Sequence, residues 1–189
     1  TIPSFRDDIL SIMDELQIDK AHLVGQSMGG YSVLRCALDQ PERVNTLTLS
    51  CTPAGIPIPN PTESVKNLGA RGAEGIQATM SKKTFENPAL VQLYASIQSF
   101  NTEFSFERLS ALRREEDQVN IDLLGSMEIP TLFISGREDP LFLPEQLSQL
   151  VPHFHSASIK IVDDAGHSPY FEQPTVFNKL LSDHINQNL

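Results

Sequence analysis

The residues of this chain that could do covalent chemistry centre on one serine between glycines. Positions 25–30 read Gly-Gln-Ser-Met-Gly-Gly, which contains the pattern G-x-S-x-G around Ser27. An apolar run precedes the pattern and a helical pattern follows it, so we predict a sharp strand-to-helix turn that presents the serine side chain to solvent. Gly25 and Gly29 lack a Cβ and are expected to let the strand and the helix approach closely. The helix dipole would favour the negative charge that develops beside Ser27 during a reaction. The alternative interpretation is an ordinary glycine-rich turn in which Ser27 caps the helix.

A serine is a weak nucleophile near neutral pH and needs a base, and the chain contains five histidines. His167 lies in the loop 163–169 after a predicted strand, and parallel α/β sheets place their active sites at the carboxyl ends of strands. We therefore predict that His167 is the base, the alternative being a solvated loop histidine. The other histidines fall in a strand, a connecting segment and the last helix, where packing or surface roles are expected: His22, His153, His155 and His184.

A histidine base needs an acid that holds its tautomer, and the segment 136–140, Gly-Arg-Glu-Asp-Pro, follows another predicted strand. Asp139 is the preferred acid because it lies deepest in the turn and the following proline fixes the chain. Glu138 is the competitor. Two further carboxylates are weaker candidates because they are too near the histidine in sequence to reach round its ring: Asp163 and Asp164.

Four short runs of apolar and β-branched residues alternate with helical patterns, and each predicted site residue follows one of these runs. Alternating strands and helices predict an α/β fold with a mostly parallel sheet, and such continuous strands are typically covered by helices on both faces. The predicted strands are 21–24, 44–49, 129–135 and 159–162, and the predicted helices are 1–18, 28–38, 144–150 and one that begins at Pro174.

Apolar spacing also predicts which faces of the end helices are buried. Thr1 or Ser4 can cap the first helix, whose apolar positions are Phe5, Ile9, Ile12, Met13 and Leu16. The inward face of the last helix is expected to be Val176, Phe177, Leu180, Leu181 and Ile185.

The long segment between the second and third predicted strands differs from the rest of the chain. It opens with a proline-rich stretch, 51–61, and continues as short helices. Pro88 starts one helix, with Leu90, Val91, Tyr94 and Ile97 on a face, and another is marked by Phe106, Leu109 and Leu112. We predict one catalytic domain with a core at 1–55, a helical lid at 56–120 and further core at 121–189.

Composition excludes several classes of partner. The chain has 189 residues, with 24 acidic and 14 basic side chains and a formal charge of −10, so its field repels nucleic acids and anionic lipids. No apolar run approaches the length of a membrane helix. Cys36 and Cys51 form neither a disulfide framework nor a metal site, and reduced cysteines favour a cytoplasmic protein.

Several blocks of the sequence resemble α/β-hydrolases, and are most similar to the lid-bearing branch of carboxylesterases, enol-lactonases and meta-cleavage C–C hydrolases. The blocks are 21–30, 41–44, 129–139 and 165–169, and the likeness is loosest at 56–119. The resemblance implies Ser27 as nucleophile, Asp139 as acid, His167 as base and the Met28 backbone N–H as an oxyanion donor. It implies no metal or organic cofactor, and Ser27 disfavours the branches that use an aspartate nucleophile.

The resemblance also implies a small-molecule substrate in a mostly apolar pocket without a fixed charge. The positions that correspond to this pocket are Gln26, Met28, Ile56, Ile58, Leu141 and Phe142. We expect a serine esterase that cleaves an ester, thioester or lactone through an acyl-enzyme. The alternatives are hydrolysis of a C–C bond of the meta-cleavage type, and a non-catalytic ligand-binding or signalling module.

One departure from the family concerns residues 1–20. Family members carry several strands before this helix, including a loop that completes the oxyanion hole, and nothing in 1–20 resembles them. We therefore expect the strand 21–24 to present an unpaired edge that promotes self-association or accepts a second chain.

Overall fold

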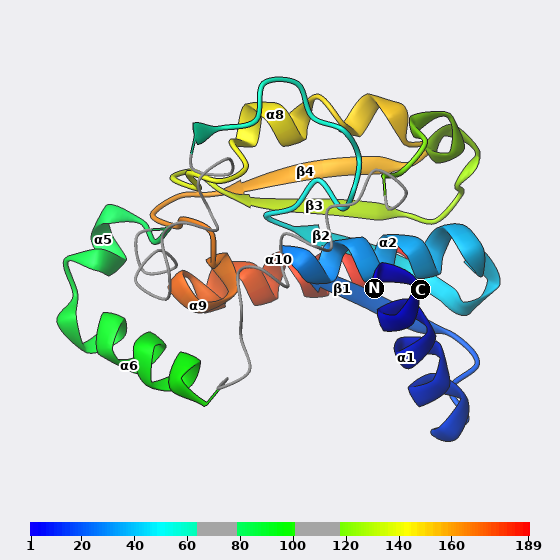
Figure 1. The fold of residues 1–189 in the computed structure, drawn as a ribbon, viewed down its shortest axis with the longest axis horizontal. Coiled ribbons are helices and arrows are strands. Elements are labelled where there is room, and N and C mark those ends of the chain that lie inside the picture. The colour runs from blue at the N-terminus through cyan, green and yellow to red at the C-terminus, as the bar shows by residue number, and fades with distance from the viewer. Residues whose placement is uncertain (64–78, 101–117) are drawn as a thin grey trace.

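The computed structural model describes residues 1–63, 79–100 and 118–189, and its centre is a parallel sheet of four strands in the order β1-β2-β3-β4. Every adjacent pair runs parallel, and helices cover the sheet from both sides (Figure 1). The predicted α/β class with a mostly parallel sheet is confirmed. The strands are β1 (Ala21–Gln26), β2 (Val44–Ser50), β3 (Thr131–Gly136) and β4 (Ala157–Val162).

The two central strands are buried on both faces because alternate residues enter two different apolar clusters. Phe133 of β3 packs in the larger cluster, whereas Leu132 and Ile134 pack in the smaller one on the opposite face. The edge strands depart from the predicted coverage, since Val24 of β1 is 42% exposed and Ile161 of β4 is 38% exposed. The expectation of coverage on both faces is correct for β2 and β3 and wrong for these two edge-strand positions, which the helices leave partly uncovered.

The helices around the sheet divide between these two clusters. α2 and α8 supply the larger cluster, α10 supplies Phe177 to the smaller one, and α1 rests mainly on α2. The α-helices of the core are α1 (Ile2–Glu15), α2 (Met28–Asp39), α8 (Pro144–Ser148), α9 (Pro169–Glu172) and α10 (Pro174–Asn186). Short 3₁₀ turns are η1 (Pro41–Arg43), η4 (Ile121–Ser126) and η5 (Val151–His153).

The end helices bury narrower faces than their sequences predict. Thr1 caps α1 by accepting a hydrogen bond from the Ser4 backbone N–H, but Ile12 and Leu16 are 60% and 63% exposed. The buried residues of α1 are Ile2, Leu10 and Met13. Because α1 packs mostly on another helix, a single stripe makes its contact and the adjoining apolar positions stay outside. In α10 only Phe177 is fully buried, with Leu180 and Leu181 packed beside it.

Two helices of the segment between β2 and β3, which we call the insertion (residues 51–130), lie beside α9 (Figure 1). They are α5 (Lys82–Phe85) and α6 (Pro88–Ser99), and the Asn87 side chain caps α6. Of the predicted α6 face, Ile97 is exposed and the others are half-buried. The helix marked by Phe106, Leu109 and Leu112 lies outside the described residues. The division into core and lid stays a prediction.

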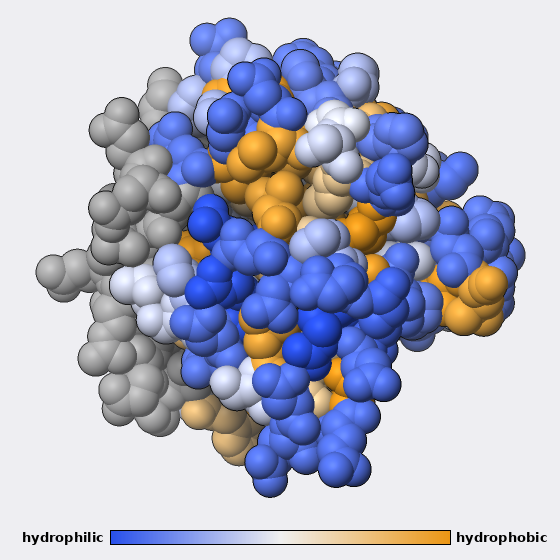
Figure 2. Space-filling view, turned by 90° about the vertical axis from the view of Figure 1, so that its right-hand side faces the viewer, coloured by the Kyte–Doolittle hydropathy of each residue, from blue (hydrophilic) through white to orange (hydrophobic). Residues whose placement is uncertain are grey.

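The surface shows separate apolar patches between hydrophilic side chains on the side of the molecule that faces right in Figure 1 (Figure 2). Within the described ranges, no helix has the length and apolar character needed to cross a membrane. Cys36 and Cys51 are both free and buried. In that part of the chain β1 pairs with β2 alone, so self-association through the other edge of β1 stays a prediction.

Candidate active site

Ser27 occupies a strained turn between the last residue of β1 and the first residue of α2. Its backbone has φ 50° and ψ −117°, an uncommon conformation for a residue with a side chain. Its N–H donates to the Ser50 carbonyl (2.9 Å), and its own carbonyl accepts from the Gly30 N–H (3.0 Å). These bonds hold the predicted strand-to-helix turn. The side chain is half-buried and does not project into solvent, because the loop 163–169 lies over it. We call this loop, which carries His167, the histidine loop.

Two glycines allow the close approach of β1, α2 and the segment after β2. A Cβ on Gly25 would lie 2.5 Å from Val33 Cγ2, and a Cβ on Gly30 would lie 2.3 Å from Thr52 Cγ2. A Cβ on Gly29 would meet no atom within 4 Å. The expectation that Gly29 allows the close approach is therefore wrong, and Gly30 has this role. Successive residues of a helix point in different directions, so Gly30 faces the segment after β2 and Gly29 does not.

The imidazole of His167 bridges the other two residues of the predicted triad. Its Nε2 lies 2.9 Å from Ser27 Oγ, and its Nδ1 lies 3.0 Å from Asp139 Oδ2. Both distances suit hydrogen bonds. His167 is 7% exposed, so it is not a solvated loop side chain. The arrangement gives the serine hydroxyl an acceptor for its proton and gives the imidazole a buried carboxylate partner.

Asp139 is fixed by backbone donors as well as by the histidine. Its Oδ1 accepts hydrogen bonds from the N–H groups of Leu141 (2.9 Å) and Phe142 (3.3 Å), and the residue is 1% exposed. Donors on one oxygen leave the other directed at the imidazole. The turn that follows β3 therefore orients the carboxylate before any substrate is present.

The competing carboxylates point elsewhere. Glu138 accepts a hydrogen bond from the Lys82 backbone N–H (2.8 Å) at the start of α5. Asp163 pairs with Arg137, and Asp164 pairs with Lys83 at 2.7 Å. Each of these side chains thus has a partner other than the imidazole, and Asp139 is the carboxylate that the fold brings to His167.

Gln26 uses both ends of its side-chain amide within the protein. Its Nε2 donates to the His167 carbonyl (2.6 Å), and its Oε1 accepts from the Ser50 hydroxyl (2.5 Å). These contacts favour a positioning role for Gln26, and its predicted contact with substrate stays a prediction.

The apolar positions assigned to the substrate pocket lie deeper than expected. Ile56, Leu141 and Phe142 are buried members of the larger apolar cluster, with Ile58 packed against it. The Phe142 ring also lies 6.0 Å from the His167 ring. Met28 is 37% exposed and begins α2, so its N–H belongs to the first turn, where helical N–H groups have no partner inside the helix. Their roles toward a substrate stay predictions.

Cys51, which follows β2, adds a buried thiol to this cluster. Within the described ranges, Cys51, Asp139 and His167 are the group whose ligand atoms lie close enough, within 4.8 Å of one another, to hold a metal. Burial and the nearby Asp139 raise the pKa of the Cys51 thiol well above its ordinary value. In the structure these groups bond to protein partners: His167 bonds to Asp139, and the Cys51 sulfur accepts from the Gly136 N–H at 3.4 Å.

One residue of the site was missed from the sequence. Glu172, at the end of α9, is 6% exposed and accepts hydrogen bonds from the N–H groups on either side of His167. Its only signal was an acidic residue shortly after the predicted base, a position that equally suits a surface side chain.

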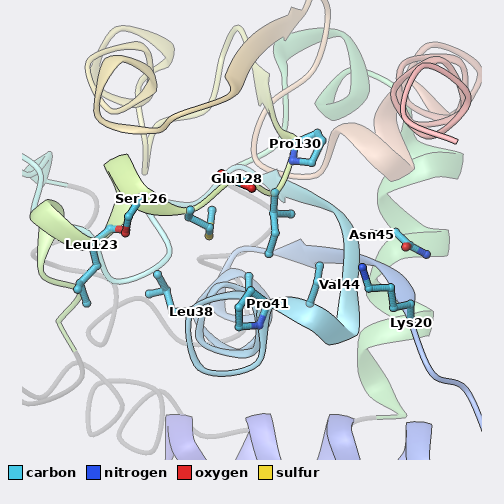
Figure 3. Close-up of a pocket in the computed structure, with 12 residues that line it drawn as sticks. Lys20, Leu38, Pro41, Val44, Asn45, Leu123, Ser126, Glu128 and Pro130 are labelled. Atoms are coloured by element: carbon cyan, nitrogen blue, oxygen red, sulfur yellow. The ribbon is translucent and has the colours of Figure 1, made fainter.

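A separate groove, whose lining residues are drawn in Figure 3, lies at the amino ends of the strands. Its volume is about 500 Å³, and it separates the end of α2 and start of β2 from the segment before β3. Its lining includes Lys20, Leu38, Pro41, Val44, Leu123 and Glu128, of which Lys20 and Glu128 are charged. Since the serine, histidine and aspartate all follow the carboxyl ends of strands, this groove is not part of their site.

Comparison with known proteins places the chain in a family. Residues 1–180 match the alpha/beta hydrolase family. The chain belongs to that family. It is 30% identical, over 92% of its length, to a 2-hydroxy-6-oxononadienedioate/2-hydroxy-6-oxononatrienedioate hydrolase from Paraburkholderia xenovorans, of which it spans 65%.

Two further similarities extend this finding. A 2-hydroxy-6-oxo-6-phenylhexa-2,4-dienoate hydrolase from Burkholderia cepacia is 27% identical over 94% of this alpha/beta hydrolase chain and 66% of the relative. The solved structure of a meta-cleavage product hydrolase from Pseudomonas fluorescens superposes with a TM-score of 0.78 at 26% identity, covering 99% of this chain and 72% of the other.

Proposed function

We propose that this alpha/beta hydrolase cleaves a carbon–carbon bond of a 2-hydroxy-6-oxo dienoate, with Ser27, His167 and Asp139 as nucleophile, base and acid. The observation that carries the proposal is the imidazole of His167, which is hydrogen-bonded to Ser27 at 2.9 Å and to Asp139 at 3.0 Å. The named activities of the relatives supply the substrate class. Relative to our sequence-based expectation of an ester substrate, these names favour the C–C alternative.

In the proposed first step, Ser27 Oγ attacks the 6-oxo carbonyl carbon while His167 Nε2 takes the hydroxyl proton. The carbonyl π electrons move to oxygen, and the Met28 N–H donates to the resulting oxyanion. Asp139 stabilises the imidazolium, since its carboxylate faces Nδ1.

In the second step, the bond between carbons 5 and 6 breaks, and the acyl group stays on Ser27. With the substrate as its 2-oxo tautomer, the electron pair from carbon 5 delocalises to the oxygen on carbon 2. His167 returns its proton to the departing fragment and then activates a water that hydrolyses the acyl-enzyme. The products are a carboxylic acid and an unsaturated 2-hydroxy acid.

Hydrolysis of an ester, thioester or lactone is the second candidate. It uses the same attack by Ser27, and the leaving oxygen or sulfur takes the proton from His167. The observation that favours it is the hydrogen bond between His167 Nε2 and Ser27 Oγ, which activates a serine toward any acyl carbon within reach.

Parallel assays test the proposal. The protein and its Ser27→Ala variant are given 2-hydroxy-6-oxo-6-phenylhexa-2,4-dienoate and p-nitrophenyl butyrate, and a fluorophosphonate probe reports nucleophile labelling. We expect serine-dependent loss of the dienoate absorbance with a higher kcat/KM than for the ester. Ester turnover alone would select the second candidate. No labelling and no turnover would support the non-catalytic module.

A further inference from the structure

Glu172 joins the histidine loop to the insertion through one buried carboxylate. Its Oε1 accepts hydrogen bonds from the N–H groups of Gly166 (2.9 Å) and Ser168 (3.1 Å), the residues before and after His167. Its Oε2 accepts from the N–H of Ser81 (2.7 Å), which precedes α5 in the insertion. One oxygen therefore serves the histidine loop, and the other serves the insertion.

Backbone contacts bring the same two segments together at His167 itself. The His167 N–H donates to the Thr79 carbonyl at 2.8 Å. A Cβ on Gly166 would lie 2.2 Å from that carbonyl oxygen, so the two backbones touch with no space for a side chain. The described part of the insertion that precedes α5 thus lies directly on the histidine loop.

Helix α6 makes a second contact with the loop. The Tyr94 hydroxyl lies 3.2 Å from the Ser168 hydroxyl, and the Tyr94 and Phe171 rings meet edge to face at 5.0 Å. Burial raises the pKa of Tyr94 to about 12, so the phenol remains a neutral hydrogen-bonding group. The loop that carries His167 is therefore bounded by the insertion at two separate places.

We propose that Glu172 is a positioning residue that couples the part of the insertion around Ser81 to the alignment of His167. This inference rests on the proposed role of His167 as general base. Buried backbone N–H groups require acceptors, and Glu172 supplies one to each of three such groups. Without it, the loop must rearrange to satisfy Gly166 and Ser168. A shift of about 1 Å in a catalytic group is enough to lower a rate by up to about a hundredfold.

The unequal use of the two oxygens makes the proposal testable with two variants of one residue. In Glu172→Gln, the amide oxygen can keep two of the three hydrogen bonds if it faces the N–H groups of Gly166 and Ser168. The new NH₂ group then faces the Ser81 N–H, and two donors cannot bond to each other. The glutamine therefore breaks the insertion side selectively. Glu172→Ala removes the acceptor from both sides. Glu86→Gln, an exposed change at the end of α5, is the matched control.

The experiment measures backbone amide hydrogen exchange in the intact chain together with the fluorophosphonate labelling rate of Ser27. We expect Glu172→Gln to accelerate exchange at Ser81 by about tenfold or more while Gly166 and Ser168 change far less. Glu172→Ala should accelerate exchange at all three. Labelling should fall about tenfold or more in Glu172→Ala and by a smaller factor in Glu172→Gln, with no change in the Glu86→Gln control.

The readouts separate the two proposals. Equal exchange at all three amides in Glu172→Gln, or parental labelling in Glu172→Ala, overturns the coupling role. If Glu172→Ala fails to fold, the exchange pattern and labelling of Glu172→Gln decide the matter. A parent protein that shows the expected exchange but whose Ser27 never reacts overturns the proposed function and leaves the contact between insertion and loop standing.

Discussion

The side-chain amide of Gln26 donates a 2.6 Å hydrogen bond to the backbone carbonyl of His167, joining residues 141 positions apart in the chain. The same amide accepts from Ser50 at the end of β2. The residue before Ser27 therefore holds the backbone carbonyl of His167, and a hydrogen bond from β2 holds that residue. The turn after β1 and the loop after β4 are parts of one hydrogen-bonded unit.

Replacing Gln26 with Met should lower kcat by about tenfold, equivalent to ~1.4 kcal/mol, while KM stays near the parental value. Methionine keeps the length of the side chain but leaves Ser50 and the His167 carbonyl without this partner. Steady-state kinetics check the split, with exposed Gln92→Met as control. A rise in KM at constant kcat would instead place Gln26 in contact with substrate.

Removal of the Ser27 hydroxyl should abolish turnover and leave the fold intact. We expect Ser27→Ala to lower kcat by at least about a thousandfold and to lose fluorophosphonate labelling. The free energy of unfolding should change by less than about 1 kcal/mol, because alanine creates no large cavity. Activity within about tenfold of the parent would mean that the nucleophile is another residue.

The two adjacent carboxylates after β3 should respond oppositely to neutralisation. Asp139→Asn should lower kcat by about a thousandfold or more, because the amide no longer fixes the tautomer of His167. Glu138→Gln keeps an oxygen for the Lys82 N–H and should leave turnover near that of the parent. The comparison uses equal protein concentrations and circular dichroism as a folding check. A larger loss in Glu138→Gln would refute the assignment of the acid.

Neighbouring glycines of α2 should differ in their effect on stability. Gly30→Ala places a Cβ against buried Thr52 and should lower the free energy of unfolding by about 1–3 kcal/mol. Gly29→Ala meets no atom and should be neutral or stabilising by up to about 1 kcal/mol. Urea unfolding measures both. Equal destabilisation would contradict the close contact at Gly30.

His184 of α10 should make the fold less stable in acid. Burial of the ring lowers the pKa of His184 below its ordinary value of 6.5. As the pH falls below 6.5, His184 therefore takes up a proton more readily in the unfolded chain than in the folded chain. Stability contributed by the neutral ring is complete above pH 6.5 and declines as the pH falls toward the folded-state value. Unfolding from about pH 7.5 to about pH 5 should show a smaller decline in His184→Asn than in the parent or in exposed His155→Asn.

Local pattern was enough to predict the turns that bring Ser27, Asp139 and His167 together. The strands and turns that carry Ser27, Asp139 and His167 were predicted because each is defined by a few adjacent residues: an apolar run, then glycine or a polar turn. Because the strands are parallel, all three turns lie at the carboxyl ends of the strands, on the same side of the sheet. The preference for Asp139 over Glu138 likewise came from its depth in a short turn.

Exposure of the outer faces was decided by tertiary structure instead. Ile12 and Leu16 have the same helical spacing as buried residues of α1, yet the packing of α1 on α2 leaves them outside. Periodicity shows that an apolar stripe exists, but the neighbouring element determines how much of it is covered. The same reason separates the central strands from the edge strands.

The alignment of the site was also decided only in three dimensions. Gly30 rather than Gly29 meets the neighbouring segment, Gln26 reaches His167, and Glu172 reaches Ser81 across 91 positions of sequence. Each relationship joins segments far apart in the chain, and the residues in between carry no pattern that records it. A sequence specifies which groups are present at each turn, whereas the packing of helices and loops on the sheet determines which of those groups meet.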